Sequence, residues 1–211
     1  MLQKTLLGAV TGLVLFANAA AASQTIDAKY KSIGAATLGK AVGREKASAG
    51  GRVRLYANGG IYSSKAAGTH AVYGPAFDKY KSLGAEKGKL GFPVTDVLTT
   101  PDGGTQTLFR HGYVLVDKAG AASADVTPKA TYTADSVTYS GGTKPAMKSD
   151  TEAILAPETP ASGGTVTCNC SKGMSLEIGM CAISPAGISS IRCQKGSCRN
   201  SCVITIVKGA Q

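Results

Sequence analysis

The 211-residue sequence has no tryptophan, only two histidines and few charged residues. Charged residues make up 17% of the chain, and aromatic residues make up 6%. Helical bundles and coiled coils depend on abundant Ala, Glu, Lys and Leu, so this composition argues against both. The sequence also contains neither a G-x-S-x-G nor an H-E-x-x-H string. We therefore expect no catalytic residues, no cofactor and no metal.

Glycine is abundant, with 27 residues, and the formal net charge is +10. Glycine supplies the positive φ that tight turns need. A glycine-rich chain with few charges suits short strands joined by many turns. We expect a mainly β fold with short helices.

Residues 1–22 have the pattern of a secretory signal peptide. Lys4 precedes an apolar stretch over 6–16, and small residues accumulate over 17–22. The alternative is an uncleaved membrane anchor, but the apolar run is shorter than the about 20 residues that span a bilayer. We expect cleavage after Ala22, no transmembrane segment in the mature chain, and a secreted, periplasmic or cell-envelope location.

Three regions follow the predicted signal peptide. Residues 23–117 are glycine-rich and basic, residues 118–164 are dominated by Ala, Thr, Ser, Pro and Gly, and residues 165–211 hold all six cysteines. A segment composed like 118–164 buries too little apolar surface to offset its ordering entropy. We interpret it as a flexible linker, mostly disordered, although residues 130–139 alternate loosely and could add one strand.

The basic region repeats itself at a period near 50 residues. KYKSIG at 29–34 matches KYKSLG at 79–84, and LYANGGIY at 55–62 matches LFRHGYVL at 108–115. Between these blocks, Leu38-Gly39 corresponds to Leu90-Gly91. Repeats of this kind bury their apolar faces against each other. We predict two units, each a short helix, a glycine turn and a strand hairpin.

LGFPVTD at 90–96, followed by PDGGTQTLFRHG at 101–112, resembles the LGFP repeat. The resemblance covers roughly residues 26–117. LGFP repeats occur in exported bacterial proteins, where they are thought to attach the protein to the cell wall, so the resemblance implies an envelope-binding module rather than a catalyst. The first unit departs from the family pattern, because it reads LGKAVG at 38–43 and has Ser63 where the family often has Trp.

Carbohydrate binding needs aromatic faces that stack on sugar rings and polar groups that orient hydroxyls. Asn58 and His111 occupy equivalent positions at the predicted hairpin bends. The full set of predicted ligand-binding residues is Asn58, Tyr62, His70, Arg110, His111 and Tyr113. The alternative for the aromatic members is a place in the core, since large side chains of small repeats usually fill the interior.

The six cysteines lie in the last 44 residues, at Cys168, Cys170, Cys181, Cys193, Cys198 and Cys202. An even number in a short exported segment predicts a disulfide framework that staples a small β module. Two cysteines on the same face of one strand, such as Cys168 and Cys170, should not pair with each other. The alternative is a zinc site, which the absence of histidine in this region disfavours.

These observations favour a non-enzymatic, exported protein that attaches to cell-wall or other anionic polysaccharide through its LGFP repeats. No feature indicates specific nucleic-acid binding. The alternative is a secreted hydrolase or inhibitor with an unrecognised site, in which the repeats serve only for targeting.

We predict that the mature chain begins near Ser23 and has no free thiol. Its intact mass after export should equal the chain from that residue, less two protons for each of three disulfides. A mass that corresponds to six thiols, or to an uncleaved chain, would contradict this prediction.

Overall fold

The computed structural model describes residues 25–140, 143–157, 163–170, 181–185, 190–195, 198 and 201–208. The predicted signal peptide lies outside the described residues. The described helices are all too short or too polar to cross a bilayer. The fold is mainly β, with short helices and antiparallel sheets, as the composition indicates.

The first repeat, unit one, begins with two short helices, α1 (Ile26–Ile33) and α2 (Ala35–Leu38). The side chain of Thr25 accepts a hydrogen bond from the Ala28 amide and so caps the start of α1. Four antiparallel strands follow and form sheet A: β1 (Lys46–Ser48), β2 (Gly51–Tyr56), β3 (Gly59–Ser64) and β4 (Gly68–Tyr73), paired in chain order.

The second repeat, unit two, has the same plan. It begins with helix α3 (Pro75–Ser82), with Pro75 at its first position, and the short 3₁₀ helix η1 (Ala85–Lys87). Sheet B follows, again paired in chain order: β5 (Leu98–Thr99), β6 (Thr105–Phe109), β7 (Gly112–Val116) and β8 (Ala122–Val126).

The two units confirm the repeat, but each is larger than the predicted hairpin unit. β2 and β3 pair with Tyr56 opposite Gly59, and β6 and β7 pair with Phe109 opposite Gly112. Each unit adds a strand on both sides of this hairpin and so becomes a four-stranded meander. Because β8 is the last strand of unit two, the repeat region extends to residue 126, beyond the expected end at residue 117.

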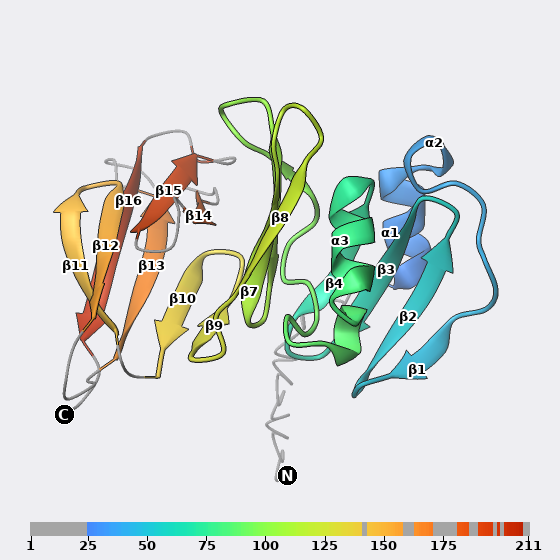
Figure 1. Ribbon diagram of the computed structural model, residues 1–211, viewed down its shortest axis with the longest axis horizontal. Helices are drawn as coiled ribbons and strands as arrows, with labels where there is room; N and C mark the ends of the chain where they lie inside the picture. Colours follow the sequence, from blue (N-terminus) through green and yellow to red (C-terminus); the bar gives the residue numbers. More distant parts are fainter. Residues whose placement is uncertain are drawn as a thin grey trace, which may run out of the picture.

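The helices and sheets of the two units alternate along the molecule (Figure 1). α1 packs on sheet A, and α3 lies between sheets A and B, so its apolar residues enter one core with residues of both sheets. Tyr80 of α3 contacts Tyr62 of β3 at a ring-centroid distance of 5.2 Å and Phe109 of β6 at 4.4 Å. The helix that opens unit two therefore also covers unit one.

Residues 118–164 differ from the expected linker. After β8 they form β9 (Ala130–Tyr132), β10 (Ser136–Tyr139), β11 (Thr143–Ser149) and β12 (Glu152–Pro157). Tyr132, Val137 and Tyr139 are buried. The composition of the segment alone suggested disorder, but its few large side chains are covered by strands from the cysteine-rich region.

The cysteine-rich strands are β13 (Gly164–Cys170), β14 (Cys181–Pro185), β15 (Ser190–Lys195) and β16 (Cys202–Lys208). They combine with β9–β12 into sheet C, with strand order β16-β13-β10-β9, and sheet D, with strand order β11-β12-β15-β14. Buried residues of both sheets form one apolar core, so the two sheets make a sandwich. The cysteine-rich residues are thus half of a larger β module.

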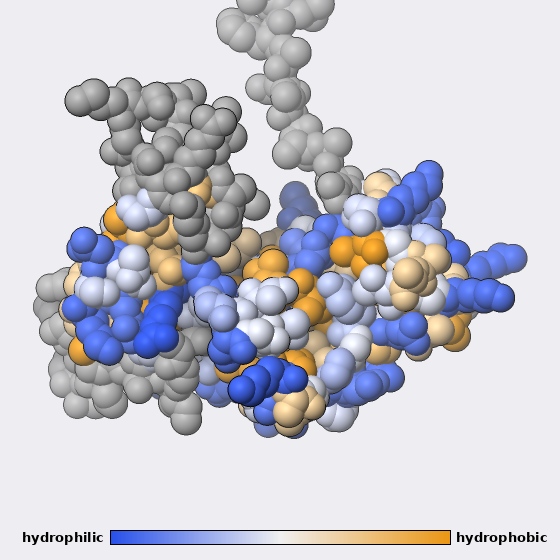
Figure 2. Space-filling view, turned by 90° about the horizontal axis from the view of Figure 1, so that it is seen from above, coloured by the Kyte–Doolittle hydropathy of each residue, from blue (hydrophilic) through white to orange (hydrophobic). Residues whose placement is uncertain are grey.

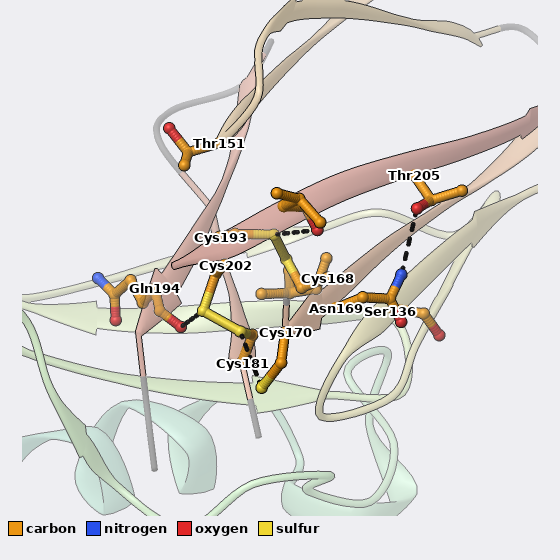
Figure 3. The surroundings of a disulfide bond; sticks show 12 residues. Ser136, Thr151, Cys168, Asn169, Cys170, Cys181, Cys193, Gln194, Cys202 and Thr205 are labelled. Carbon is orange, nitrogen blue, oxygen red and sulfur yellow. Dashed lines mark hydrogen bonds between the residues drawn. A yellow bond between two sulfur atoms is a disulfide. The ribbon is translucent and has the colours of Figure 1, made fainter. Parts of the chain in front are cut away.

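The disulfides are Cys168–Cys193, Cys170–Cys198 and Cys181–Cys202. Cys168 on β13 and Cys193 on β15 join sheet C to sheet D, and so do Cys181 on β14 and Cys202 on β16 (Figure 3). Cys168 and Cys170 do not pair with each other, as their common strand face predicts. The framework therefore fixes the spacing of the two sheets.

We predict that replacing both Cys168 and Cys193 with Ala lowers the free energy of unfolding by about 3 kcal/mol, because this bridge closes a loop of 25 residues. Chemical denaturation measures the change. Peptide mapping without reduction should recover the three pairs, and a peptide that links Cys193 to a cysteine other than Cys168 would contradict the described framework.

Candidate functional site

Each repeat holds the bend of its central hairpin under the Leu-Gly turn of its own unit. In unit one, the backbone amide of Asn58 donates to the backbone carbonyl of Leu38 at 2.9 Å. In unit two, the backbone amide of His111 donates to the backbone carbonyl of Leu90 at 3.0 Å. Both leucine side chains are fully buried. The Leu-Gly pair is therefore a backbone clamp on the bend, and this explains why it recurs.

The helix of each unit holds the same turn from the other side. The hydroxyl of Tyr30 donates to the carbonyl of Gly39 at 3.0 Å, and the hydroxyl of Tyr80 donates to the carbonyl of Gly91 at 2.7 Å. Both glycines have a positive φ, 76° and 69°, which a side chain would strain. In both units, the helix that carries the K-Y-K string is thus hydrogen-bonded to the Leu-Gly turn of the same unit.

Two of the predicted ligand-binding residues, Tyr62 and Tyr113, lie in the core. Tyr62 is 1% exposed, and Tyr113 is 5% exposed with its hydroxyl donating to Asp125 Oδ2 at 3.1 Å. Burial, with a smaller contribution from nearby carboxylates, raises the pKa of both tyrosines. Their ring faces do not reach a ligand at the surface, so for these two residues the structure corrects the predicted role. Both faces of each repeat sheet are covered, and the sequence pattern did not reveal this.

The other predicted residues lie nearer the surface but in separate places. Asn58 is exposed at the bend of unit one. Arg110 is half-buried at the bend of unit two, where its Nη1 lies 3.5 Å from the carbonyl oxygen of Ala66. These bends belong to different sheets, and the structure gives no single site that contains the whole predicted set.

Both histidines contact backbone carbonyls. Nε2 of His70 lies 2.8 Å from the carbonyl oxygen of Ala67, and Nδ1 of His111 lies 3.1 Å from that of Ala130. These contacts hold each imidazole in place. His111 therefore links the bend of unit two to the β sandwich.

Asp96, which ends the LGFPVTD string, was not among the predicted site residues. Its carboxylate accepts hydrogen bonds from Lys29 Nζ at 2.9 Å and from the Ala71 amide at 2.8 Å. His70 Nδ1 lies 3.8 Å away, within range of electrostatic attraction but too far for a hydrogen bond. Asp96 of unit two thus fastens both α1 and β4 of unit one.

Burial alone would raise the pKa of Asp96. The contacts with His70, the Ala71 amide and Lys29 outweigh burial and lower the pKa to about 2. The carboxylate is therefore ionised throughout the physiological range, and in this form it bridges the two units. The position of Asp96 at the end of the LGFP string was the sequence signal that could have indicated its role. Its partner Lys29 lies 67 residues away in the chain, so the pairing itself was not apparent from the sequence.

A cleft of about 1000 Å³ lies between sheet B and strands β14 and β15 of the sandwich. Two of its lining residues join the walls: the side-chain amide of Gln106 donates to the carbonyl of Ile183 at 3.1 Å and accepts from the Ser184 hydroxyl at 2.9 Å. The lining includes hydroxyl or amide side chains at Thr99, Thr100, Thr105, Ser123, Ser184 and Gln194. Sequence reasoning missed this cleft because it treated its two walls as separate modules.

The sulfur atoms of Cys170, Cys181 and Cys198 lie within 4.8 Å of one another. A zinc site needs thiolates. All three cysteines are in disulfides, Cys170 with Cys198 and Cys181 with Cys202, so these sulfurs do not have the chemical form that zinc requires. The cluster consists of sulfurs from two adjacent disulfides.

Comparison with protein families finds that the LGFP repeat matches residues 38–88, about a quarter of the chain. The match begins at the Leu-Gly turn of unit one and ends after the helix of unit two. No curated protein matches the chain. The LGFP repeat suggests a cell-envelope-associated protein, which is consistent with the disulfides.

We predict that Asp96→Asn lowers the free energy of unfolding at pH 7 by about 2 kcal/mol, the equivalent of its pKa shift. Because the folded-state pKa is depressed, the contribution is complete above the unfolded value near 3.8 and is lost as the pH falls towards 2. Denaturation measured at pH 7 and at pH 2 should therefore give a large difference between variant and parent only at pH 7. Asp78→Asn is the matched control, since Asp78 makes only an exposed ion pair with Lys81.

Proposed function

We propose that the protein is a non-enzymatic, exported cell-envelope protein that binds a cell-wall polysaccharide. The observation that carries the proposal is the match of residues 38–88 to the LGFP repeat. The two repeat units pack on each other through α3 and form a row (Figure 1). The repeats position a cleft whose second wall comes from the disulfide-linked sandwich. The chain thus combines a repeat that occurs in envelope proteins with a cleft for a ligand.

The chemistry of the cleft suits a neutral, hydroxyl-rich ligand. Hydroxyl and amide side chains both donate and accept hydrogen bonds, as sugar hydroxyls do. Leu115 and Ala122 add an apolar wall, and Asp102, Asp117 and Arg192 add charges of both signs. None of the described lining residues is aromatic. We therefore expect modest affinity for each sugar unit, which suits a polymer that offers many equivalent units.

The absence of catalytic activity is part of the proposal. It is supported by the two histidines, whose imidazoles are engaged with the carbonyls of Ala67 and Ala130 rather than with a nucleophile. The competing proposal is a secreted hydrolase or inhibitor. Of these two, the hydrolase requires a different catalytic group and predicts turnover of the wall material during incubation.

We predict that Ser123→Trp weakens binding to insoluble cell-wall material at least several-fold. Ser123 is an exposed residue of β8 that lines the cleft, so an indole at this position takes up part of the cleft without replacing a core side chain. Thr138→Trp, at an exposed strand position outside the cleft, is the matched control and should bind like the parent. Sedimentation with wall material measures binding, and thermal melting should show that both variants are folded.

Two results would overturn this proposal. If the parent chain does not sediment with wall material, the protein is not a wall-binding protein. If both Trp variants bind equally well, the cleft is not the contact site. Release of soluble sugar or peptide from the walls would instead support the hydrolase.

A further inference from the structure

The two repeats share a fold but carry very different charge. Residues 25–73, which contain unit one, have eight basic and two acidic residues, whereas residues 75–126, which contain unit two, have six of each. Unit one thus carries a net charge of +6 and unit two carries none. Equivalent backbones with unequal charge show that the fold does not require the excess.

Both acidic residues of unit one are already paired with basic residues of that unit. Asp27 accepts from Arg54 at 2.9 Å, and Glu45 pairs with Arg52. Among the ion pairs of the described residues, none involves Lys31, Lys40, Arg44 or Lys46, and all four are exposed. The net charge of unit one is therefore carried by basic side chains that face solvent.

Three of these basic side chains lie on one short segment, which we call the basic segment: residues 40–46, which follow α2 and end at Lys46, the first residue of β1. The segment runs beside β2, because Ala41 forms a bridge with Tyr56 and the Val42 amide donates to the Leu55 carbonyl. It forms the outer end of the row (Figure 1), and hydrophilic side chains project from this end (Figure 2). Val42, 60% exposed, lies among the charges.

The equivalent segment of unit two, residues 92–98, has the opposite character. Phe92 and Val94 are buried, and a Cβ on Gly51 would collide with the Phe92 ring, which shows how closely unit two packs on unit one. The residue that corresponds to Phe92 is Lys40, and the residue that corresponds to buried Val94 is exposed Val42. Among the described residues no repeat precedes unit one, so Lys40 and Val42 do not pack on a neighbouring repeat.

A terminal repeat needs a polar outer surface, but it does not need a surface of one sign. A solvating surface ordinarily mixes both signs, because a large single-sign field repels itself and is retained chiefly where it attracts a partner. We propose that the basic segment, together with Lys31, binds a linear polyanion that carries phosphate or carboxylate groups. This inference rests on the proposed envelope role and adds a second contact surface, distant from the cleft.

The geometry fits an extended anionic chain better than a single small anion. The cations of the basic segment are exposed, and they are spaced at residues 40, 44 and 46 along the connection into β1, the edge strand of sheet A. A lone phosphate would meet one or two of these cations in open solvent, where such pairs contribute little. A polymer meets several at once, and their contributions combine.

The test compares two triple variants that remove the same charge from each unit. Lys40→Gln/Arg44→Gln/Lys46→Gln neutralises the basic segment, and Lys79→Gln/Lys87→Gln/Lys89→Gln removes three basic residues of unit two. Binding of the full chain to inorganic polyphosphate, to polygalacturonate and to uncharged dextran is measured by calorimetry at several salt concentrations. Thermal melting checks that both variants remain folded.

We expect the parent to bind at least one of the two polyanions but not dextran, with affinity that falls as salt rises. The unit-one variant should lose about tenfold in affinity and show a shallower salt dependence, whereas the unit-two variant should change by less than about twofold. Preference for polyphosphate or for polygalacturonate identifies the anionic group.

Equal losses in the two variants, or no binding of the parent to either polyanion, would overturn the inference. The outcome is separable from the proposed function. If the chain sediments with wall material but binds neither polyanion, the proposed envelope role stands and the polyanion surface is ruled out. If it binds polyanions but does not sediment with wall material, the polyanion surface stands and the envelope role is ruled out.

Discussion

Both faces of each repeat sheet must be covered, and the rest of the structure follows from this requirement. Tyr56 and Ile61 of sheet A pack with residues of α1, while Tyr62 on the opposite face packs on α3. Sheet B faces α3 on one side, and its other face carries Leu108 and Tyr113 into the core of the β sandwich. The sandwich thus covers the outer face of sheet B, as a third repeat would if it followed unit two.

The parts of the fold that could be predicted from the sequence depend on contacts that are local in the chain. Tyr30 reaches Gly39, and Tyr80 reaches Gly91, within about ten residues, so the recurring strings mark the recurring structure directly. The cysteine framework was likewise visible, because an even number of cysteines in a short exported segment is typical of disulfide-linked modules. The pairing itself depends on the sandwich, which the sequence did not reveal.

The parts that could not be predicted depend on distant partners. Val137 lies in a segment whose composition suggests disorder, but it pairs with Val166 of β13 and is fully buried. Tyr62 was a candidate for stacking on a sugar ring, with burial in the core as the alternative, and it is covered by Tyr80 of the next repeat. The repeats bury both faces of their sheets. The exposed ends of the row and the cleft beside the sandwich are therefore the surfaces whose side chains can differ between the two repeats.

The boundaries of the LGFP match, which we call its frame, bear on the length of such a molecule. The matched residues 38–88 start at one Leu-Gly turn and stop just before the next, so they contain a clamp, a sheet and the helix that covers that sheet. An added inner layer would need Phe92 and Val94 after its Leu-Gly turn in place of Lys40 and Val42, because these positions of unit two are buried against unit one. A frame with that change would lengthen the row by one layer while leaving the basic end and the cross-linked end unchanged. The repeat is therefore a unit of length, and the number of copies sets how far apart the two ends are held.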